Sequence, residues 1–367
     1  MQNHNSRRAL KRFFIISAIA FLVFLAGLSE TLVENVYSKN IYLGVSVAQR
    51  FLSSLVPFPL GDFIYLLLIG YVLWKIVVFF RKLTNNGFNR SNRLGIPLGI
   101  VNFILILYIA FKVLWGLNYS RPSISERLNL SDDKYTTAEL VSLGGYLVEK
   151  LNEIQTRRIP KSDWTIEELQ RNAKLAYDKL RKKNSAFNYP QPVVKPVLFS
   201  WLITKIGIEG YYNPLSGEAN VNMRLPSTGI PFVTCHEIAH QLGIGREDEA
   251  NLLGYLTSIH SDDINFRYSG YYSIVKNVLF EIRFKAPEAY EMLFEKLNTK
   301  TITEIENDRN FWRKYNNQMF GYLDVAFDKF LKLNNQPKGT DSYQDIVLWL
   351  TNYHKKELKA GTKTLQP

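Results

Sequence analysis

Hydrophobic residues are concentrated in the first third of the chain, where they form three long, nearly uninterrupted runs. The runs cover residues 13–28, 63–80 and about 95–117. At a rise of about 1.5 Å per residue, helices of this length cross most of the hydrocarbon core of a bilayer. The pattern therefore predicts three transmembrane helices, and we expect residues 1–117 to form a membrane anchor.

Basic residues flank these runs in two clusters, which are Arg7, Arg8, Lys11 and Arg12, and Arg81, Lys82, Arg90 and Arg93. Because positively charged flanks stay in the cytoplasm, both clusters are expected on that side, and everything after residue 117 is expected outside. Residues 28–30 offer no small-x-small cleavage site, so we expect the first run to stay as a membrane helix rather than to be removed as a signal peptide.

Residues 29–62, between the first two runs, carry few charges and end in the sequence PFPLGD. A segment of this composition is typical of the membrane interface. We expect Tyr37 and Tyr42 to lie near the lipid headgroups, where tyrosine is enriched.

From residue 118 to residue 367 the composition is that of one soluble domain. Thr136 with Glu139, and Thr165 with Glu168, form capping boxes ahead of amphipathic helices. Short β-like pieces and then apolar residues at helical spacing follow. The expected helices are 140–151, 169–180, 271–284, 286–297, 302–333 and 343–358, and the expected strands are 197–200, 206–212 and 219–223. We expect a mainly helical α+β domain with a small sheet.

The net charge is +12, and hydrophobic residues make up 46% of the chain. No basic stripe with interleaved aromatics and no known nucleic-acid motif occurs, so we expect no nucleic acid partner. The basic residues beside the apolar runs favour membrane lipid instead. Cys235 is the one cysteine, so no disulfide can form within the chain, and we expect this residue to be a small core residue.

Residues 231–253 (PFVTCHEIAHQLGIGREDEANLL) carry a set of metal-ligand side chains. His236 and His240 are four apart, so on a helix both imidazoles leave the same face and can reach one tetrahedral Zn²⁺ ion. Glu237 lies beside the first histidine, where a general base could take a proton from a zinc-activated water. The spacing therefore predicts a zinc site with Glu237 as its catalytic residue.

A third metal ligand is expected from the acidic helix that follows the turn at Gly243 and Gly245. Glu247, Ala250, Asn251 and Gly254 share one face of that helix, and the small residues there let two helices approach. We therefore prefer Glu247 as ligand, with Asn251 hydrogen-bonding a ligand histidine from behind. Glu249 lies on a more apolar face and is the runner-up.

The motif His236, Glu237, His240 with Glu247-x-x-Ala250-Asn251 resembles the gluzincin metallopeptidases. Residues 235–251, with PFPLGD and residues 331–347 (LKLNNQPKGTDSYQDIV), are similar over most of the chain to an uncharacterised bacterial membrane-protein family of predicted zinc peptidases. The resemblance implies a zincin-like catalytic domain. The interval from His240 to Glu247 is shorter than in thermolysin-like enzymes, so the choice between Glu247 and Glu249 stays open.

Together, the motif and the resemblance predict a membrane-anchored zinc metallopeptidase in the bacterial cytoplasmic (inner) membrane, with its catalytic domain extracytoplasmic or periplasmic. The substrate would be a peptide or envelope protein, although an amide in the cell wall fits equally well. The alternative is a non-catalytic zinc-binding or inactive domain that binds an envelope component. Structural zinc sites are usually closed by four protein ligands rich in cysteine, and one cysteine favours an open catalytic site.

Zinc peptidases commonly bind extended substrate along an edge strand near the zinc helix, and residues 217–223 (GEANVNM) are the candidate for that role; the alternative is plain hairpin scaffolding. A donor to the developing oxyanion is also expected. The sequence does not choose among the candidate donors His260, Tyr268, Tyr271, Tyr322 and His354.

Overall fold

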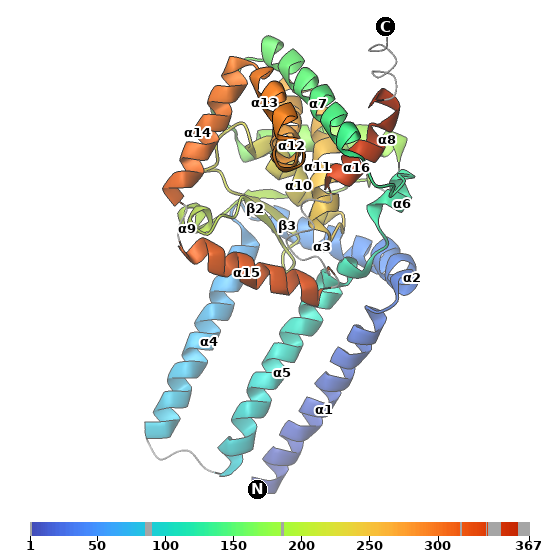
Figure 1. Ribbon diagram of the computed structural model, residues 1–367. Helices are drawn as coiled ribbons and strands as arrows, with labels where there is room; N and C mark the ends of the chain where they lie inside the picture. Colours follow the sequence, from blue (N-terminus) through green and yellow to red (C-terminus); the bar gives the residue numbers. More distant parts are fainter. Residues whose placement is uncertain are drawn as a thin grey trace. The chain divides into compact units, whose positions relative to one another are not determined.

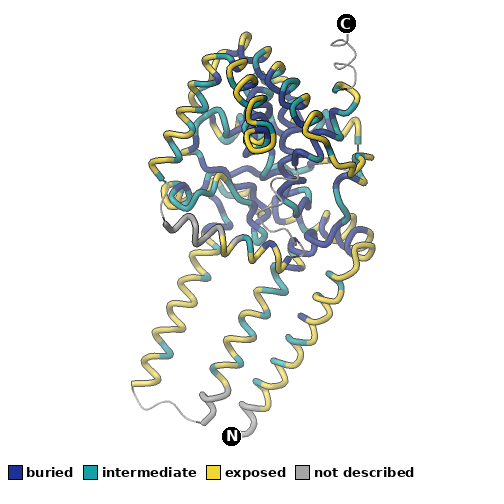
Figure 2. Tube along the Cα trace, viewed as in Figure 1, coloured by how far each residue is buried: buried dark blue, intermediate teal, exposed yellow. Residues whose placement is uncertain are grey.

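The computed structural model describes residues 2–84, 90–184, 187–315, 318–334, 336 and 346–358. The chain divides into two compact units, Met1–Arg121 with Asn213–Gly217, and Pro122–Tyr212 with Glu218–Pro367. Each unit has its own buried residues (Figure 2). The first contains the apolar helices and the second contains the histidine motif.

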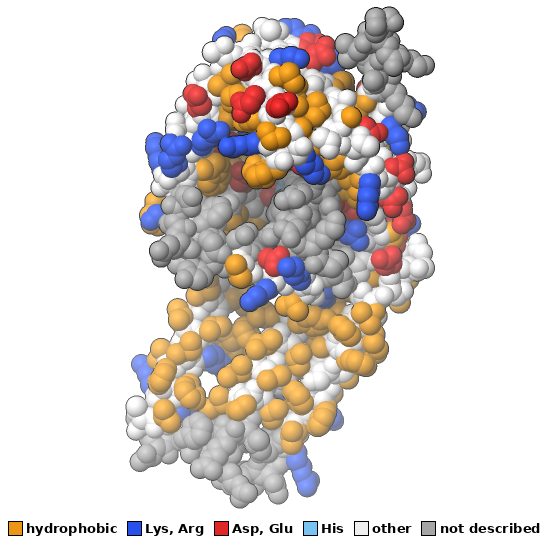
Figure 3. All heavy atoms as spheres, viewed as in Figure 1, with side chains coloured by type: hydrophobic (Ala, Val, Ile, Leu, Met, Phe, Trp, Pro, Cys, Tyr) orange, Lys and Arg blue, Asp and Glu red, His pale blue; other side chains and the backbone are white. Residues whose placement is uncertain are grey.

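Three helices of the first unit are long and apolar enough to cross a membrane, within the described residues: α1 (Gln2–Ala26), α4 (Leu60–Thr84) and α5 (Arg90–Leu114). Their large apolar side chains face outward, and Figure 3 shows them as an almost continuous hydrophobic surface. The three predicted apolar helices are therefore confirmed. The third ends at Leu114 rather than residue 117, because Trp115 leaves the helical region with φ −159° and the 3-10 helix η2 (Gly116–Ser120) follows.

The segment between α1 and α4 is helical throughout most of its length. It comprises α2 (Glu30–Leu32), the π-helix η1 (Val33–Ile41) and α3 (Tyr42–Ser54). Tyr37 and Tyr42 are buried, so their side chains contact protein rather than lipid headgroups. A buried tyrosine hydroxyl needs a partner, and that of Tyr37 donates to the carbonyl of Val113 at 3.0 Å.

The short stretch Asn213–Gly217 belongs to the first unit although the chain around it belongs to the second. The Gln49 amide donates to the Pro214 carbonyl at 2.8 Å, and the Ser53 hydroxyl donates to the Ser216 carbonyl at 2.7 Å. Gly217 has φ +73°, and a Cβ there would lie 2.9 Å from Gln49. Helix α3 therefore holds a tight turn that only glycine completes without strain.

The second unit begins with α6 (Ile124–Leu128), α7 (Thr137–Arg157) and α8 (Ile166–Lys183). Both predicted capping boxes are present, with Thr136 and Thr165 each accepting from the backbone N–H three residues later. Apolar side chains at helical spacing are buried along α7, at Leu140, Leu143, Leu147 and Leu151. The two helices are therefore confirmed and extend a few residues beyond the predicted bounds.

The sheet has three strands in the order β1-β3-β2: β1 (Val194–Pro196), β2 (Gly210–Asn213) and β3 (Glu218–Val221). β1 runs parallel to β3, with Val194 opposite Ala219. The expected strand at 197–200 is wrong, because helix α9 (Ser200–Lys205) starts there. Residues 217–223 contain the central strand, so the prediction that they form an edge for substrate is also wrong: both sides of β3 are already paired.

The rest of the described part of the second unit is helical, and two of its helices, α10 (Ile230–Gln241) and α11 (Glu247–Ile259), carry the motif (Figure 1). The others are α12 (Ile264–Lys285), α13 (Pro287–Glu295), α14 (Thr299–Tyr315), α15 (Gln318–Leu333) and α16 (Ile346–Tyr353). The one predicted run 302–333 corresponds to α14 and α15, with residues 316–317 outside the described part. Nearly every residue of α10 and α11 is buried, so this helix pair forms the centre of the unit (Figure 2).

Candidate metal centre

Helix α10 carries the two histidines of the motif. Pro231 lies in its first turn, where the missing N–H costs no hydrogen bond. The four-residue spacing places both imidazoles on one side, as predicted, and the two Nε2 atoms lie 3.1 Å apart. Both side chains are largely buried, so their nitrogen atoms face protein groups rather than bulk water.

A tight turn brings helix α11 back against α10. Gly243 has φ +76°, a conformation that favours glycine, and the Gln336 amide donates to the Gly245 carbonyl at 3.0 Å. About two turns along α11, Gly254 touches the backbone of His236: a Cβ there would lie 3.2 Å from its Cα. The predicted face of small residues therefore does let the two helices approach closely.

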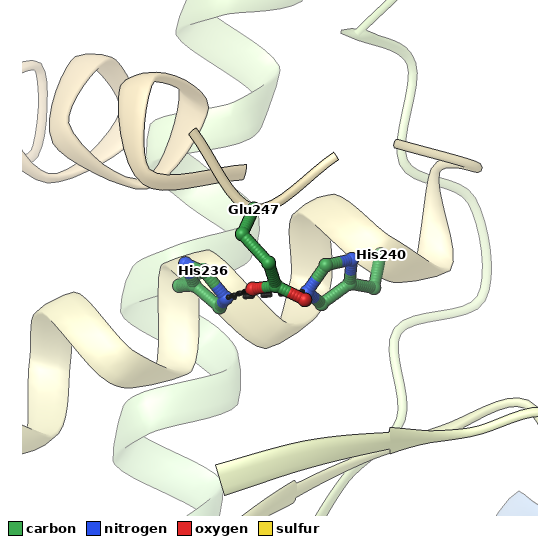
Figure 4. Close-up of side chains that lie close together, drawn as sticks. All are labelled: His236, His240 and Glu247. Atoms are coloured by element: carbon green, nitrogen blue, oxygen red, sulfur yellow. Dashed lines mark hydrogen bonds and ion pairs between the residues drawn. The ribbon is translucent and has the colours of Figure 1, made fainter. Parts of the chain in front are cut away.

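Glu247, at the first position of α11, completes a triangle with the two histidines (Figure 4). Its Oε2 lies 3.3 Å from His236 Nε2 and 3.6 Å from His240 Nε2. Ligands held tetrahedrally at about 2.0–2.1 Å from a zinc ion are about 3.3–3.4 Å apart. The three atoms thus have the spacing of three corners of a zinc tetrahedron, and these residues fit the ion.

The imidazoles are held by hydrogen bonds on their far sides. His240 Nδ1 lies 2.7 Å from the carbonyl oxygen of Ile244, and His236 Nδ1 lies 2.9 Å from Asn251 Oδ1. Since a carbonyl only accepts, each Nδ1 carries the proton, and in the neutral ring the lone pair of Nε2 faces Glu247. Asn251 therefore makes the predicted contact, and such contacts fix the orientation of metal-binding histidines.

The charges in the triangle are strongly coupled. Burial disfavours the charged imidazolium of His240, but the carboxylate of Glu247 outweighs it and raises the pKa of His240 to about 9. Burial also opposes ionisation of Glu247, yet the charges and hydrogen bonds of His240 and His236 hold its pKa well below the ordinary value. The triangle thus stabilises positive charge between its three side chains, and a bound cation would be stabilised there in the same way as a proton.

Glu237 lies beside the triangle, 5% exposed, and its Oε2 is buried with no hydrogen-bond partner among the described residues. Burial raises the pKa of Glu237 to about 7, against the lowering effect of His236 and His240. Gly210 of β2 covers this carboxylate: a Cβ there would lie 2.8 Å from Oε1. One oxygen of this buried carboxylate is therefore able to accept a proton or a hydrogen bond.

Glu249 and Cys235 lie outside the triangle. Glu249 Oε1 accepts from the Ser123 hydroxyl at 2.9 Å and from the Ile124 N–H at 3.0 Å, and Arg246 lies 3.7 Å away. Cys235 is fully buried in the core, and burial raises the pKa of its thiol to about 12. Of the two candidate glutamates, the structure brings Glu247 to the histidines and uses Glu249 to anchor α6.

The expected oxyanion donors are engaged by other groups. His260 Nδ1 lies 2.7 Å from the Leu256 carbonyl, the Tyr268 hydroxyl pairs with Thr301 at 2.9 Å, and His354 Nε2 pairs with Tyr255 at 2.9 Å. Tyr271 packs against the Tyr255 ring. The side chain of Tyr322 lies outside the described part of the chain. The contacts of these four described candidates are with groups outside the triangle.

Sequence reasoning missed Gly210, which lies 27 positions before Glu237 in the chain. A glycine in a short strand marks a close approach of backbone to another group, and that is the one signal that pointed to it. That this group is the Glu237 carboxylate could be identified only from the fold.

Comparison with known proteins adds a family but no activity. Residues 37–351 match a family described as "Protein of unknown function (DUF3810)". Neither the curated proteins nor the solved structures give a match to this chain. The matched range includes the triangle, Glu237 and the apolar helices α4 and α5, so the family relationship extends over both units.

Proposed function

The chain belongs to the DUF3810 family of proteins of unknown function, and for it we propose the activity of a membrane-anchored, zinc-dependent metallopeptidase. The observation that carries the proposal is the triangle of His236, His240 and Glu247, with edges of 3.1, 3.3 and 3.6 Å. Among the described residues, these are the three that could hold one ion together. Three protein ligands leave the fourth corner of the tetrahedron open, as in catalytic rather than structural zinc sites.

A zinc ion held here would act as a Lewis acid that activates water and polarises a substrate carbonyl. Glu237 is the group placed to move protons. Its unpartnered Oε2 takes a proton from the attacking water and passes it to the leaving amine. Asn251 and the Ile244 carbonyl keep the two imidazoles in the orientation that binds the ion.

The apolar helices support the membrane part of the proposal. α1, α4 and α5 are long enough to cross a bilayer, and their outward apolar surface suits lipid. With the basic clusters of the flanks in the cytoplasm, residues 118–367 lie outside the cytoplasmic membrane. The amide substrate is then a peptide, an envelope protein or a cell-wall crosslink.

Replacement of the proposed base is the test. Glu237→Gln in the full chain should retain zinc but lower the rate of amide hydrolysis about 10²–10⁴-fold, the usual contribution of a general base. Zinc content and cleavage of a peptide library are measured together, in detergent. Glu306→Gln, which removes a carboxylate exposed on α14, is the matched control and should keep full activity.

Full activity in Glu237→Gln would refute the assignment of the base. A wild-type protein that binds zinc and cleaves no amide in peptide or cell-wall libraries would instead support a non-catalytic domain that binds an envelope component.

A further inference from the structure

A pocket of about 300 Å³ opens beside the candidate metal centre, within the second unit. Val233 lines it and lies one helical turn before Glu237 on α10. Glu209 also lines it and directly precedes Gly210, the residue that touches the Glu237 carboxylate. Helices α12 and α14 close the other side through Tyr272, Lys276 and Asp308. A group bound in this pocket would therefore lie next to the proposed reaction centre.

The charged side chains of the pocket are unevenly paired. Lys276 forms an ion pair with Asp308, and the Tyr272 hydroxyl lies 3.5 Å from the same carboxylate. Glu304 is paired with Arg158 at 3.0 Å. Glu209 remains: it is exposed in the pocket, its backbone carbonyl accepts from the Asn222 N–H at 3.0 Å, and its carboxylate makes no hydrogen bond or ion pair among the described residues. One carboxylate of the pocket thus forms no ion pair within the described part of the chain.

A cation bound beside Glu209 would stabilise the ionised form of its carboxyl. Desolvation by the surrounding protein raises the pKa of this carboxyl, as does Asp308, whereas Lys276 and His236 lower it. The Tyr272 ring already accommodates an ammonium group, since Lys276 Nζ lies 4.8 Å from its centre. A volume of this size is at the lower end of small-molecule sites and is large enough for one side chain.

We propose that this pocket selects the substrate, and that Glu209 binds an ammonium or guanidinium group next to the bond that is cut. The inference rests on the proposed peptidase function and names its substrate class as amides beside a cationic group. That cation is either a basic side chain or the free amine at the start of a peptide. Glu209 is a specificity residue, whereas Glu237 carries the chemistry.

Binding is measured with the zinc-loaded full chain carrying Glu237→Gln, so that bound peptide is not consumed. The probes are two N-acetylated hexapeptide pools that differ at one central position, which is lysine in the first and Nε-acetyl-lysine in the second. A third pool lacks lysine and has a free N-terminus. Bound peptide is separated by filtration and quantified by mass spectrometry.

The lysine pool should be retained at least about tenfold better than its acetylated match, the ratio expected for one charge-assisted hydrogen bond. Adding Glu209→Gln should bring the ratio close to one, whereas adding the control Glu306→Gln should leave it unchanged. Retention of the third pool through Glu209 would show that the pocket takes the terminal amine. Equal retention of the first two pools, with no Glu209-dependent retention of the third, would overturn the proposal, as would a lysine preference that survives Glu209→Gln.

The rates at which the wild-type chain hydrolyses the three pools distinguish a failure of this inference from a failure of the proposed peptidase function. Zinc-dependent cleavage of all pools at equal rates would reject the cationic pocket and leave the peptidase intact. No cleavage of any pool, together with Glu209-dependent retention of cationic peptides, would reject the peptidase and keep the pocket.

Discussion

The two faces of helix α11 carry similar side chains in different surroundings. Glu247, Asp248 and Glu249 are consecutive, and all three are less than a tenth exposed. On one face, Asp248 accepts from the Trp349 indole at 2.7 Å, and Glu249 accepts from the Ser123 hydroxyl and a backbone N–H. On the other face, Glu247 meets the two imidazoles of α10.

The difference shows that the chemistry of the partners, rather than burial, distinguishes a candidate ligand from a structural acid. Hydroxyl, indole and amide groups bring their own protons, so Oδ2 of Asp248 and Oε1 of Glu249 each accept from a protein donor. In their neutral form the imidazoles facing Glu247 present Nε2 lone pairs, because each Nδ1 donates elsewhere. A carboxylate among such lone pairs is stable only with a proton or a metal ion between them.

The largest effect on stability is expected from replacing Glu249, which accepts hydrogen bonds from protein groups. Glu249→Ala leaves the Ile124 N–H and the Ser123 hydroxyl without their acceptor, and a buried unsatisfied group costs about 1–3 kcal/mol. We expect the thermal unfolding midpoint of the full chain to fall while bound zinc stays unchanged. Glu249→Gln retains an acceptor oxygen and should lose less. Loss of zinc in Glu249→Ala without destabilisation would reverse the roles of the two faces.

Removing the hydrogen-bond acceptor of His236 should lower zinc affinity, whereas Glu249→Ala should lower stability. In Asn251→Ala, His236 loses the acceptor for its Nδ1, so its ring is no longer held toward the ion. Such supporting contacts typically contribute about 10–100-fold to metal affinity. Competition with a zinc-sensitive chelator measures the change. An affinity equal to that of the wild type would show that the Asn251 contact does not orient a ligand.

The smallest effect is expected from the close approach of the two helices. Gly254→Ala places a methyl group 3.2 Å from the His236 backbone, which must move by a few tenths of an ångström. Helix propensity favours alanine by about 1 kcal/mol, so the two contributions oppose each other in stability. We expect the unfolding midpoint to change little and zinc affinity to fall several-fold.

Gly145→Ala on α7 is the control for that variant, since the nearest atom to its new methyl group is 3.9 Å away. It should raise the unfolding midpoint and leave zinc affinity unchanged. Equal behaviour of the two alanine variants would show that the Gly254 contact does not position His236.

Local periodicity was enough to predict much of the site. The four-residue spacing of His236 and His240 places both rings on one side of any helix, and small residues at Ala250 and Gly254 indicated where a second helix could approach. Glu247 was preferred over Glu249 because it lies on the same helix face as these small residues. The apolar helices and both capping boxes were likewise predicted from short stretches of sequence, and they are present as predicted.

Features that depend on strand order or on distant partners were not predictable. Nothing in residues 217–223 distinguishes a central strand from an edge, because that depends on β1 and β2. The sequence around Tyr37 is typical of an interfacial tyrosine and does not indicate that its hydroxyl donates to the carbonyl of Val113. The pocket beside Glu209 likewise gathers side chains from α12 and α14, far along the chain.

The most direct test of the central claim is the amount of zinc bound per chain. The full chain is purified in detergent, reconstituted with zinc and analysed by mass spectrometry beside His240→Ala, Glu247→Ala and Glu249→Ala. We predict about one zinc ion per wild-type chain, lost in the His240 and Glu247 variants and kept in the Glu249 variant. A folded wild-type chain that binds no zinc, or a Glu247→Ala variant that binds as much as the wild type, would contradict the account.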